Sequence, residues 1–109
     1  MTDPSSVTSF RLTAGRAEER IHEIAKTSGL VKLTLHAKDR MRERDIVVQD
    51  VYRILEAGHV LDAPERTQTG DWKCKITMKV PGRRTAGVVA VIVQNGRLVV
   101  VTVEWEDGR

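Results

Sequence analysis

Apolar residues recur every three to four positions in the first half of the chain and every second position in the second half. The first spacing is typical of helices with one buried face, and the second is typical of half-buried strands. Between Arg16 and Thr27 the helical spacing is carried by Ala17, Ile21, Ile24 and Ala25. With Thr13 as its N-cap and Gly29 beyond its end, this segment predicts an amphipathic helix on the surface of the core.

One strand and two more helices are predicted before the middle of the chain. Apolar and polar residues alternate over 31–35, which predicts a short half-buried strand. A helix over 36–44 would turn Ala37 and Met41 inward. After a break, the spacing over 48–58 predicts a third helix that ends at a glycine.

The second half of the chain predicts antiparallel strands. Over 72–80 apolar residues alternate with lysine and threonine, so one face of this strand is expected in the core and one in water. Asn95-Gly96 between two β-rich runs predicts a hairpin with a two-residue turn. That turn would pair Gln94 with Arg97, Ile92 with Val99, and Val89 with Thr102. A regular last strand would place Thr102 and Glu104 on its apolar face. Such a polar pair marks either a functional site or, as favoured here, the end of the core.

The element order predicts the α+β class, with N-terminal helices packed on one face of a four-stranded antiparallel β-sheet. Residues 1–14 are expected to form a loose arm and residues 15–109 a single domain. At 109 residues the chain can bury a core without disulfides or metals.

Composition excludes several classes of protein. With 40% apolar and 30% charged residues, the chain is too apolar to be wholly disordered. No apolar run approaches the roughly 20 residues of a membrane span, and the N-terminus has no secretory pattern. The single cysteine, Cys74, cannot form an internal disulfide, so we expect a cytoplasmic protein with an inert core thiol. The sequence has no His-x-x-x-His pair and no glycine-rich phosphate loop, so neither a metal nor a cofactor is expected.

Positive charge is concentrated in two segments. Residues 31–44 carry five basic and two acidic residues, and residues 72–84 carry five basic and no acidic ones. If the fold brings the segments together, they form a patch suited to phosphates.

The first basic segment contains a candidate catalytic set. His36, Arg40 and Arg44 fall within a sector of about 80° on a helix. An imidazole transfers protons near neutral pH, and a guanidinium holds a phosphate through two parallel hydrogen bonds. Phosphodiester cleavage without a metal needs both abilities. In the structural alternative, His36 caps the strand-to-helix turn and the arginines pair with Glu43 or Asp39.

The second basic segment contains candidate contacts to a nucleic-acid backbone. They are Lys73, Lys75, Lys79, Arg83 and Arg84. In the alternative, the lysines protect an edge strand from aggregation. Trp72 and Trp105 could stack on bases, but with four aromatic residues in the chain, core packing is the favoured use of both.

Two stretches together resemble a known family. The first is His36-Ala-Lys-Asp-Arg40-Met-Arg-Glu-Arg44, followed by Val51-Tyr-Arg-Ile-Leu-Glu-Ala-Gly58. The second is Gly70-Asp-Trp72-Lys73, followed by Leu98-Val-Val-Val-Thr102-Val. Over about 31–105 the chain resembles the bacterial domain-of-unknown-function family numbered 4258. It departs at Asp45, where glycine is common, and at Val47, where a serine or threonine usually caps the next helix. Aspartate tolerates a positive φ, and the missing cap costs about 0.5–2 kcal/mol.

The resemblance carries an expectation of function. The family is similar in layout to the barnase–EndoU–colicin–RelE group of small ribonucleases, which includes toxins of toxin–antitoxin systems. This implies a RelE/barnase-like layout with His36, Arg40 and Arg44 at the motif positions. We therefore expect a toxin-like, metal-independent endoribonuclease that cleaves RNA by attack of the 2′-hydroxyl, with RNA and an antitoxin protein as partners. The alternatives are a non-catalytic RNA- or protein-binding module on the same scaffold and a domain that binds no nucleic acid.

Overall fold

The computed structural model describes residues 11–107, and most of the expected N-terminal arm, residues 1–10, lies outside them. The helices are α2 (Ala14–Ala25), the short 3-10 helix η1 (Ser28–Leu30), α3 (Leu35–Arg44) and α4 (Val48–Ala57). The strands are β1 (Val31–Leu33), β2 (His59–Val60), β3 (Glu65–Arg66), β4 (Trp72–Lys79), β5 (Thr85–Ile92) and β6 (Leu98–Trp105).

The strands form one sheet with the order β1-β6-β5-β4-β2, and β3 also pairs with β4. The predicted α+β class is confirmed, whereas the predicted four-stranded antiparallel sheet is wrong in two respects. The sheet has six strands, and β1 runs parallel to β6. The two-residue strands β2 and β3 are too short to show a period of two, and the pairing of β1 with the last strand is a long-range contact that no local pattern reports.

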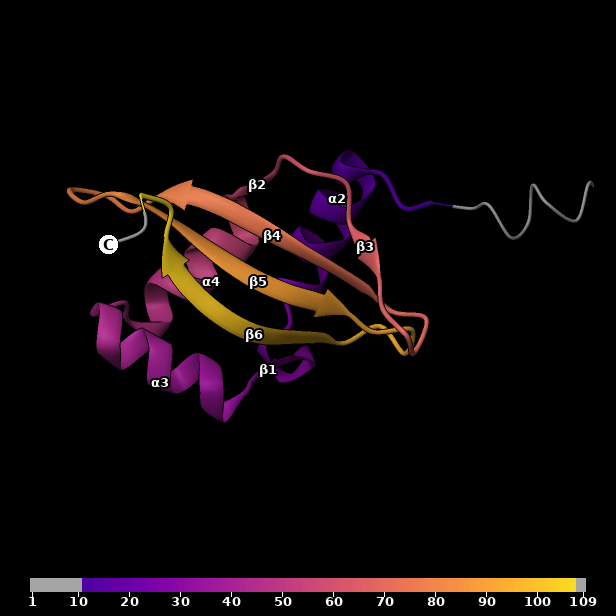
Figure 1. Ribbon diagram of the computed structural model, residues 1–109, viewed down its shortest axis with the longest axis horizontal. Helices are drawn as coiled ribbons and strands as arrows, with labels where there is room; N and C mark the ends of the chain where they lie inside the picture. The colour runs from indigo at the N-terminus through magenta and orange to yellow at the C-terminus, as the bar shows by residue number, and fades with distance from the viewer. Residues whose placement is uncertain (1–10, 108–109) are drawn as a thin grey trace, which may run out of the picture.

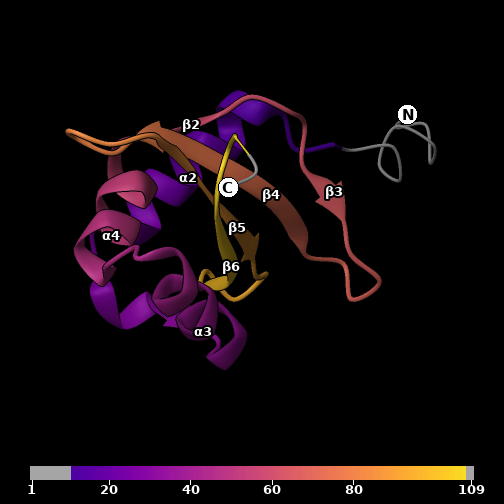
Figure 2. The same ribbon diagram turned by 60° about the vertical axis from the view of Figure 1, so that its left-hand side comes forward.

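The helices lie on one face of the sheet and leave the other face open (Figures 1 and 2). α4 packs against β4 and β5, α2 packs against α4, and α3 packs along β6. Fully buried side chains from both layers form the core, the largest being Ile21, Val51, Ile54, Leu55, Ile76, Val88, Ile92, Leu98, Val100 and Val103. Leu12, close to the start of the described residues, is also buried. No helix within residues 11–107 is long and apolar enough to span a bilayer.

The helix boundaries follow local chemistry. The hydroxyl of Thr13 accepts a hydrogen bond from the Arg16 backbone N–H, which confirms this residue as the N-cap of α2. The strand predicted over 31–35 stops at Leu33, because Thr34 caps α3. Leu35 is therefore the first residue of a helix, and it is 79% exposed rather than half-buried in a strand. Ala37 and Met41 are buried on the inner side of α3, as predicted.

The chain turns sharply between α3 and α4. Asp45 ends α3 in the left-handed conformation, with φ of 54°. Glycine adopts this conformation most easily, and aspartate, which replaces it here, tolerates it. Val47 precedes α4 in an extended conformation and provides no side-chain cap. The predicted absence of a cap on this helix is confirmed.

The β5–β6 turn differs from the predicted two-residue turn. Val93 N–H donates to the Arg97 carbonyl, so three residues form the loop, and Gly96 has φ of 86°. Ile92 therefore pairs with Leu98 and not with Val99.

A bulge in β6 restores the register farther along the hairpin. Ala90 pairs with Val100 and Val89 with Thr102, as predicted for the latter pair, so Val101 is the extra residue. The bulge reverses the alternation of faces along β6. Leu98, Val100, Val103 and Trp105 are all buried. Thr102 and Glu104 are half-buried on the opposite, open face, which corrects the prediction that they share the apolar face of this strand.

Candidate functional site

α3 is fixed at both ends along β6. At its start, the Thr34 backbone N–H donates to the Val100 carbonyl at 3.2 Å, and its hydroxyl donates to the Val101 carbonyl at 3.2 Å. At its end, the indole Nε1 of Trp105 donates to the Arg44 carbonyl at 3.0 Å. The sheet therefore sets the position of this helix and the direction in which each of its flanks faces.

The candidate catalytic set lies on one flank of α3. Lys38 and Arg42 line a pocket with the residues that connect α3 to α4, so they face the α4 side. His36, Arg40 and Arg44 occupy the flank turned away from α4. The side chains of Arg40 and Arg44 are 36% and 34% exposed, against 75% for Arg42. Arg40 and Arg44 are thus partly held against the body of the molecule, whereas Arg42 projects into solvent.

Glu43 joins the two arginines of this flank. Its carboxylate accepts hydrogen bonds from Arg40 and, at 3.3 Å, from Arg44. The hydrogen bond from Arg40 and the nearby charge of both arginines hold the pKa of Glu43 below its usual value. On the outer side of the helix, Arg42 pairs with Asp39. The carboxylate pairing expected in the structural alternative is therefore present.

His36 does not cap the turn from strand to helix, which was its role in the structural alternative. Thr34, not His36, caps α3 through its hydroxyl, which accepts from the Ala37 N–H at 3.0 Å. The side chain of His36 is exposed and makes no hydrogen bond or ion pair with any residue of the described range 11–107. Its ring nitrogens are thus available to a substrate.

The lysines of β4 line the open face of the sheet. Lys73 and Lys79 are exposed, and Lys75 is half-buried. Lys75 lies 3.1 Å from Glu106 and 3.7 Å from Glu104, and the hydrogen bond to Glu106 raises its pKa. β4 pairs with β5 along its whole length, and on its other side β2 and β3 pair with residues 72, 73, 76 and 77, so this side is covered at Lys73 but not at Lys75 and Lys79.

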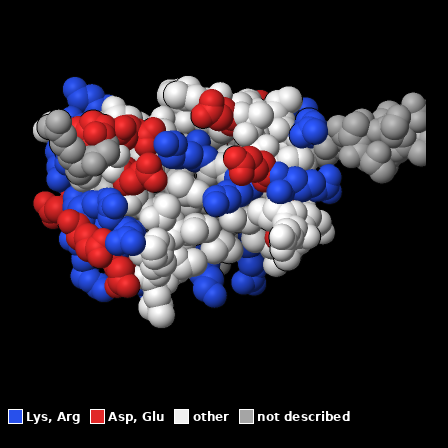
Figure 3. Space-filling model, in the orientation of Figure 1, with Lys and Arg blue, Asp and Glu red and all other residues white. Residues whose placement is uncertain are grey.

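The open face has a mixed charge pattern. Figure 3 shows this face with basic and acidic side chains interspersed around an uncharged centre. A cavity of about 280 Å³ on the sheet is lined by Asp62, Ala63, Glu65, Lys73, Cys74, Lys75, Val89 and Glu104. Glu104 reaches this face because of the β6 bulge, which the sequence pattern did not predict. Burial raises the pKa of the Cys74 thiol to about 11, in agreement with its predicted place in the core.

Arg83 and Arg84 connect the β4–β5 turn to the end of α3. Both guanidinium carbons lie 4.5 Å from the centroid of the buried Trp105 ring. Arg83 also donates to the Asp45 carbonyl at 2.6 Å, and Arg84 makes two hydrogen bonds to Asp107. These contacts give both arginines a structural role.

Predicted site residues of the second basic segment lie at different distances from α3. Arg83 and Arg84 meet the carboxyl end of α3, where Arg44 lies. Lys73 and Lys75 belong to β4, which the sheet order separates from β6 by two strand spacings, about 10 Å. The two basic segments therefore meet only at the turn beyond β4. Within residues 11–107, no group of three or more histidine, cysteine or carboxylate side chains is placed to hold a metal ion.

The fold and this geometry define a small α+β domain whose cationic helix flanks the last strand of a mixed sheet. The model of a family described as a domain of unknown function, DUF4258, matches residues 33–105. The chain belongs to this family, because the match covers more than half of its length. No curated protein and no solved structure matches the chain.

Proposed function

We propose that the protein is a toxin-like endoribonuclease that cleaves RNA without a metal, by attack of the 2′-hydroxyl. The observation that carries the proposal is the exposed imidazole of His36, which has no partner among residues 11–107 and lies one helical turn from Arg40 and two from Arg44. A proton-transfer group and two phosphate-binding groups are thus fixed on one rigid helix flank.

The chemistry assigns a role to each of these side chains. The 2′-oxygen attacks phosphorus, the bond from phosphorus to the 5′-oxygen breaks, and a 2′,3′-cyclic phosphate and a 5′-hydroxyl form. The neutral imidazole of His36 takes the 2′-hydroxyl proton while water protonates the leaving 5′-oxygen, or the protonated imidazole protonates the leaving oxygen while water takes the 2′-hydroxyl proton. Arg40 and Arg44 stabilise the charge on the phosphate oxygens.

Glu43 sets a condition for phosphate binding. Arg40 and Arg44 both pair with it, so a phosphate must compete with one carboxylate for the two guanidinium groups. Exposed ion pairs contribute only about 0–1 kcal/mol, so this exchange is inexpensive. Of the lysines on the open face, Lys73 is the better candidate to orient the flanking RNA, because Lys75 is held by Glu104 and Glu106.

A second candidate function is a non-catalytic RNA- or protein-binding module, with an antitoxin protein among its possible classes of partner. This second function is favoured by the ion pairs that the basic side chains make with carboxylates of the same chain. Arg40, Arg42, Arg44, Lys75 and Arg84 each pair with a carboxylate of the same chain. A surface neutralised in this way attracts RNA less strongly than its basic residues alone suggest.

The experiment that decides between these functions is cleavage of end-labelled single-stranded RNA in EDTA, with a 2′-O-methylated RNA of the same sequence as the control. The proposal predicts products with 2′,3′-cyclic phosphate ends from the first RNA and none from the second. Binding of both RNAs without cleavage, including with RNA presented on ribosomes, would establish the binding module instead.

A further inference from the structure

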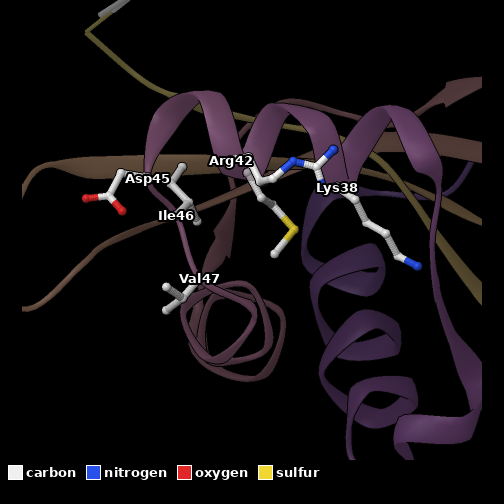
Figure 4. A pocket seen from close by; sticks show the side chains of 6 residues that line it. Lys38, Arg42, Asp45, Ile46 and Val47 are labelled. Carbon is white, nitrogen blue, oxygen red and sulfur yellow. The ribbon is translucent and has the colours of Figure 1, made fainter.

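A second surface lies on the other flank of α3, where the chain turns into α4. A pocket of about 580 Å³ is lined there by Lys38, Met41, Arg42, Asp45, Ile46 and Val47. Figure 4 shows Lys38 and Arg42 along α3 and Val47 at the start of α4. Met41 and Ile46 are buried and provide an apolar floor, while Val47 is 50% exposed. The candidate catalytic flank takes no part in this pocket.

Exposed apolar side chains occur at the pocket and at the start of α3, with Val47 in the pocket lining, Val48 next to it in the chain and Leu35 at the first position of the helix. Within the described part of the chain, the exposed large hydrophobic residues are Leu35, Val47, Val48 and Leu61. Three of these four belong to the α3–α4 hairpin. Leu35 precedes Lys38 by three residues and Arg42 by seven, so all three share one side of α3. An apolar strip with a cationic rim therefore runs along this side of the helix, and such a patch marks an interaction surface.

The charges along the strip have a defined order. Lys38 makes no ion pair with any residue of the described range. Among the described residues Arg42 pairs with Asp39 alone, and both side chains are exposed, so a partner's carboxylate can replace Asp39 at little cost. At the other end of the pocket, the carboxylate of Asp45 lies 3.7 Å from Arg83.

We propose that this surface binds an acidic amphipathic helix of a partner protein. The apolar surface between α3 and the segment that leads to α4 can receive the apolar face of another helix, through side chains spaced three, four and seven residues apart. Lys38 and Arg42 are one turn apart, so they match two carboxylates that are one turn apart on the partner. Asp45 disfavours a third carboxylate at its end of the groove, which sets the direction of the bound helix.

The same features disfavour other occupants. A second copy of this chain that packs through the same surface and places Lys38 opposite Asp45 would bring Arg42 close to its own counterpart, with repulsion between like charges. A nucleic acid would gain nothing from Val47 and Leu35, whose exposed apolar surface needs an apolar partner. The proposal does not depend on the ribonuclease activity, because it uses the opposite flank of α3.

The test is selection from a phage-displayed library of amphipathic helices of about 16 residues, with leucine at the inner positions and glutamate or lysine at each outer one. The wild-type protein is expected to enrich glutamate at two positions one turn apart. The double variant K38E/R42E is expected to enrich lysine at those positions. A fluorescent copy of the selected acidic peptide should bind K38E/R42E and Val47→Ser at least about tenfold more weakly than the wild type. The control K26E changes an exposed lysine at the C-cap of α2 and should bind the peptide normally.

Other results would overturn the proposal. These are selection without a charge preference, selection of lysine by the wild type, or binding that K38E/R42E leaves unchanged. Displacement of the peptide by single-stranded RNA that itself requires Lys38 and Arg42 would assign the surface to nucleic acid. Sedimentation that detects a dimer lost in Val47→Ser would assign it to a second copy. Circular dichroism of each variant shows whether lost binding reflects lost folding.

Discussion

Glu43 is the residue that couples the two arginines of the candidate site. It is exposed on α3, yet it accepts hydrogen bonds from both Arg40 and Arg44. The same contacts that hold the guanidinium groups near each other also keep them from a phosphate. Glu43 thus both organises the proposed phosphate site and competes with its ligand.

The titration of Glu43 tests this coupling. Because the hydrogen bond from Arg40 is the main cause of its lowered pKa, Arg40→Ala should raise that pKa toward the ordinary glutamate value, and Arg44→Ala should raise it less. A folded-state pKa below the unfolded one contributes stability above the unfolded pKa, and this contribution is lost as pH falls through the folded pKa. Carbon-detected NMR titration of the side-chain carboxyl measures all three pKa values. The same midpoint in the wild type and Arg40→Ala would show that the hydrogen bond does not form in solution.

At the scale of elements, the boundaries with a local cause were predictable. Thr13 as a cap and the uncapped start of α4 follow from the chemistry of single side chains, whereas the positive φ at Asp45 was expected from the family resemblance, in which glycine is common at this position. The β6 bulge was not predictable, because its Val101 differs in no way from the valines beside it. This one residue moves Thr102 and Glu104 to the open face, and with them an acidic neighbour of Lys75.

The start of α4 offers a test at this scale. Val47 is extended, with φ of −91° and ψ of 162°, as an N-cap requires, but its side chain cannot accept a hydrogen bond. Val47→Ser should therefore raise the free energy of unfolding by about 1 kcal/mol, as measured by urea denaturation. Val48→Ser is the matched control, because residue 48 lies inside the helix and should bring no gain. Equal or lower stability of Val47→Ser would mean that the new hydroxyl does not cap the helix.

At the scale of the whole molecule, a pattern of residues along the sequence predicts only the parts of the site that depend on residues close together in the chain. The spacing of His36, Arg40 and Arg44 predicted their common flank, because helical periodicity is local. The role of Arg83 and Arg84 depends on Trp105, which follows them by more than twenty residues in sequence and meets them only through strand pairing. The ion pairs of Lys75 with Glu104 and Glu106 also depend on strand pairing. Sequence composition thus overstated the free positive charge that the folded surface presents.

One measurement tests the central claim most directly, namely the rate of RNA cleavage in EDTA by His36→Ala beside His59→Ala. Both histidines are exposed, but His59 lies on β2, 3.4 Å from Glu18, and has no part in the proposed chemistry. Loss of a proton-transfer group should slow cleavage by about a hundredfold or more in His36→Ala, while His59→Ala cleaves at the wild-type rate. Cleavage by His36→Ala at the wild-type rate, or an equal loss in both variants, would contradict the assignment of His36.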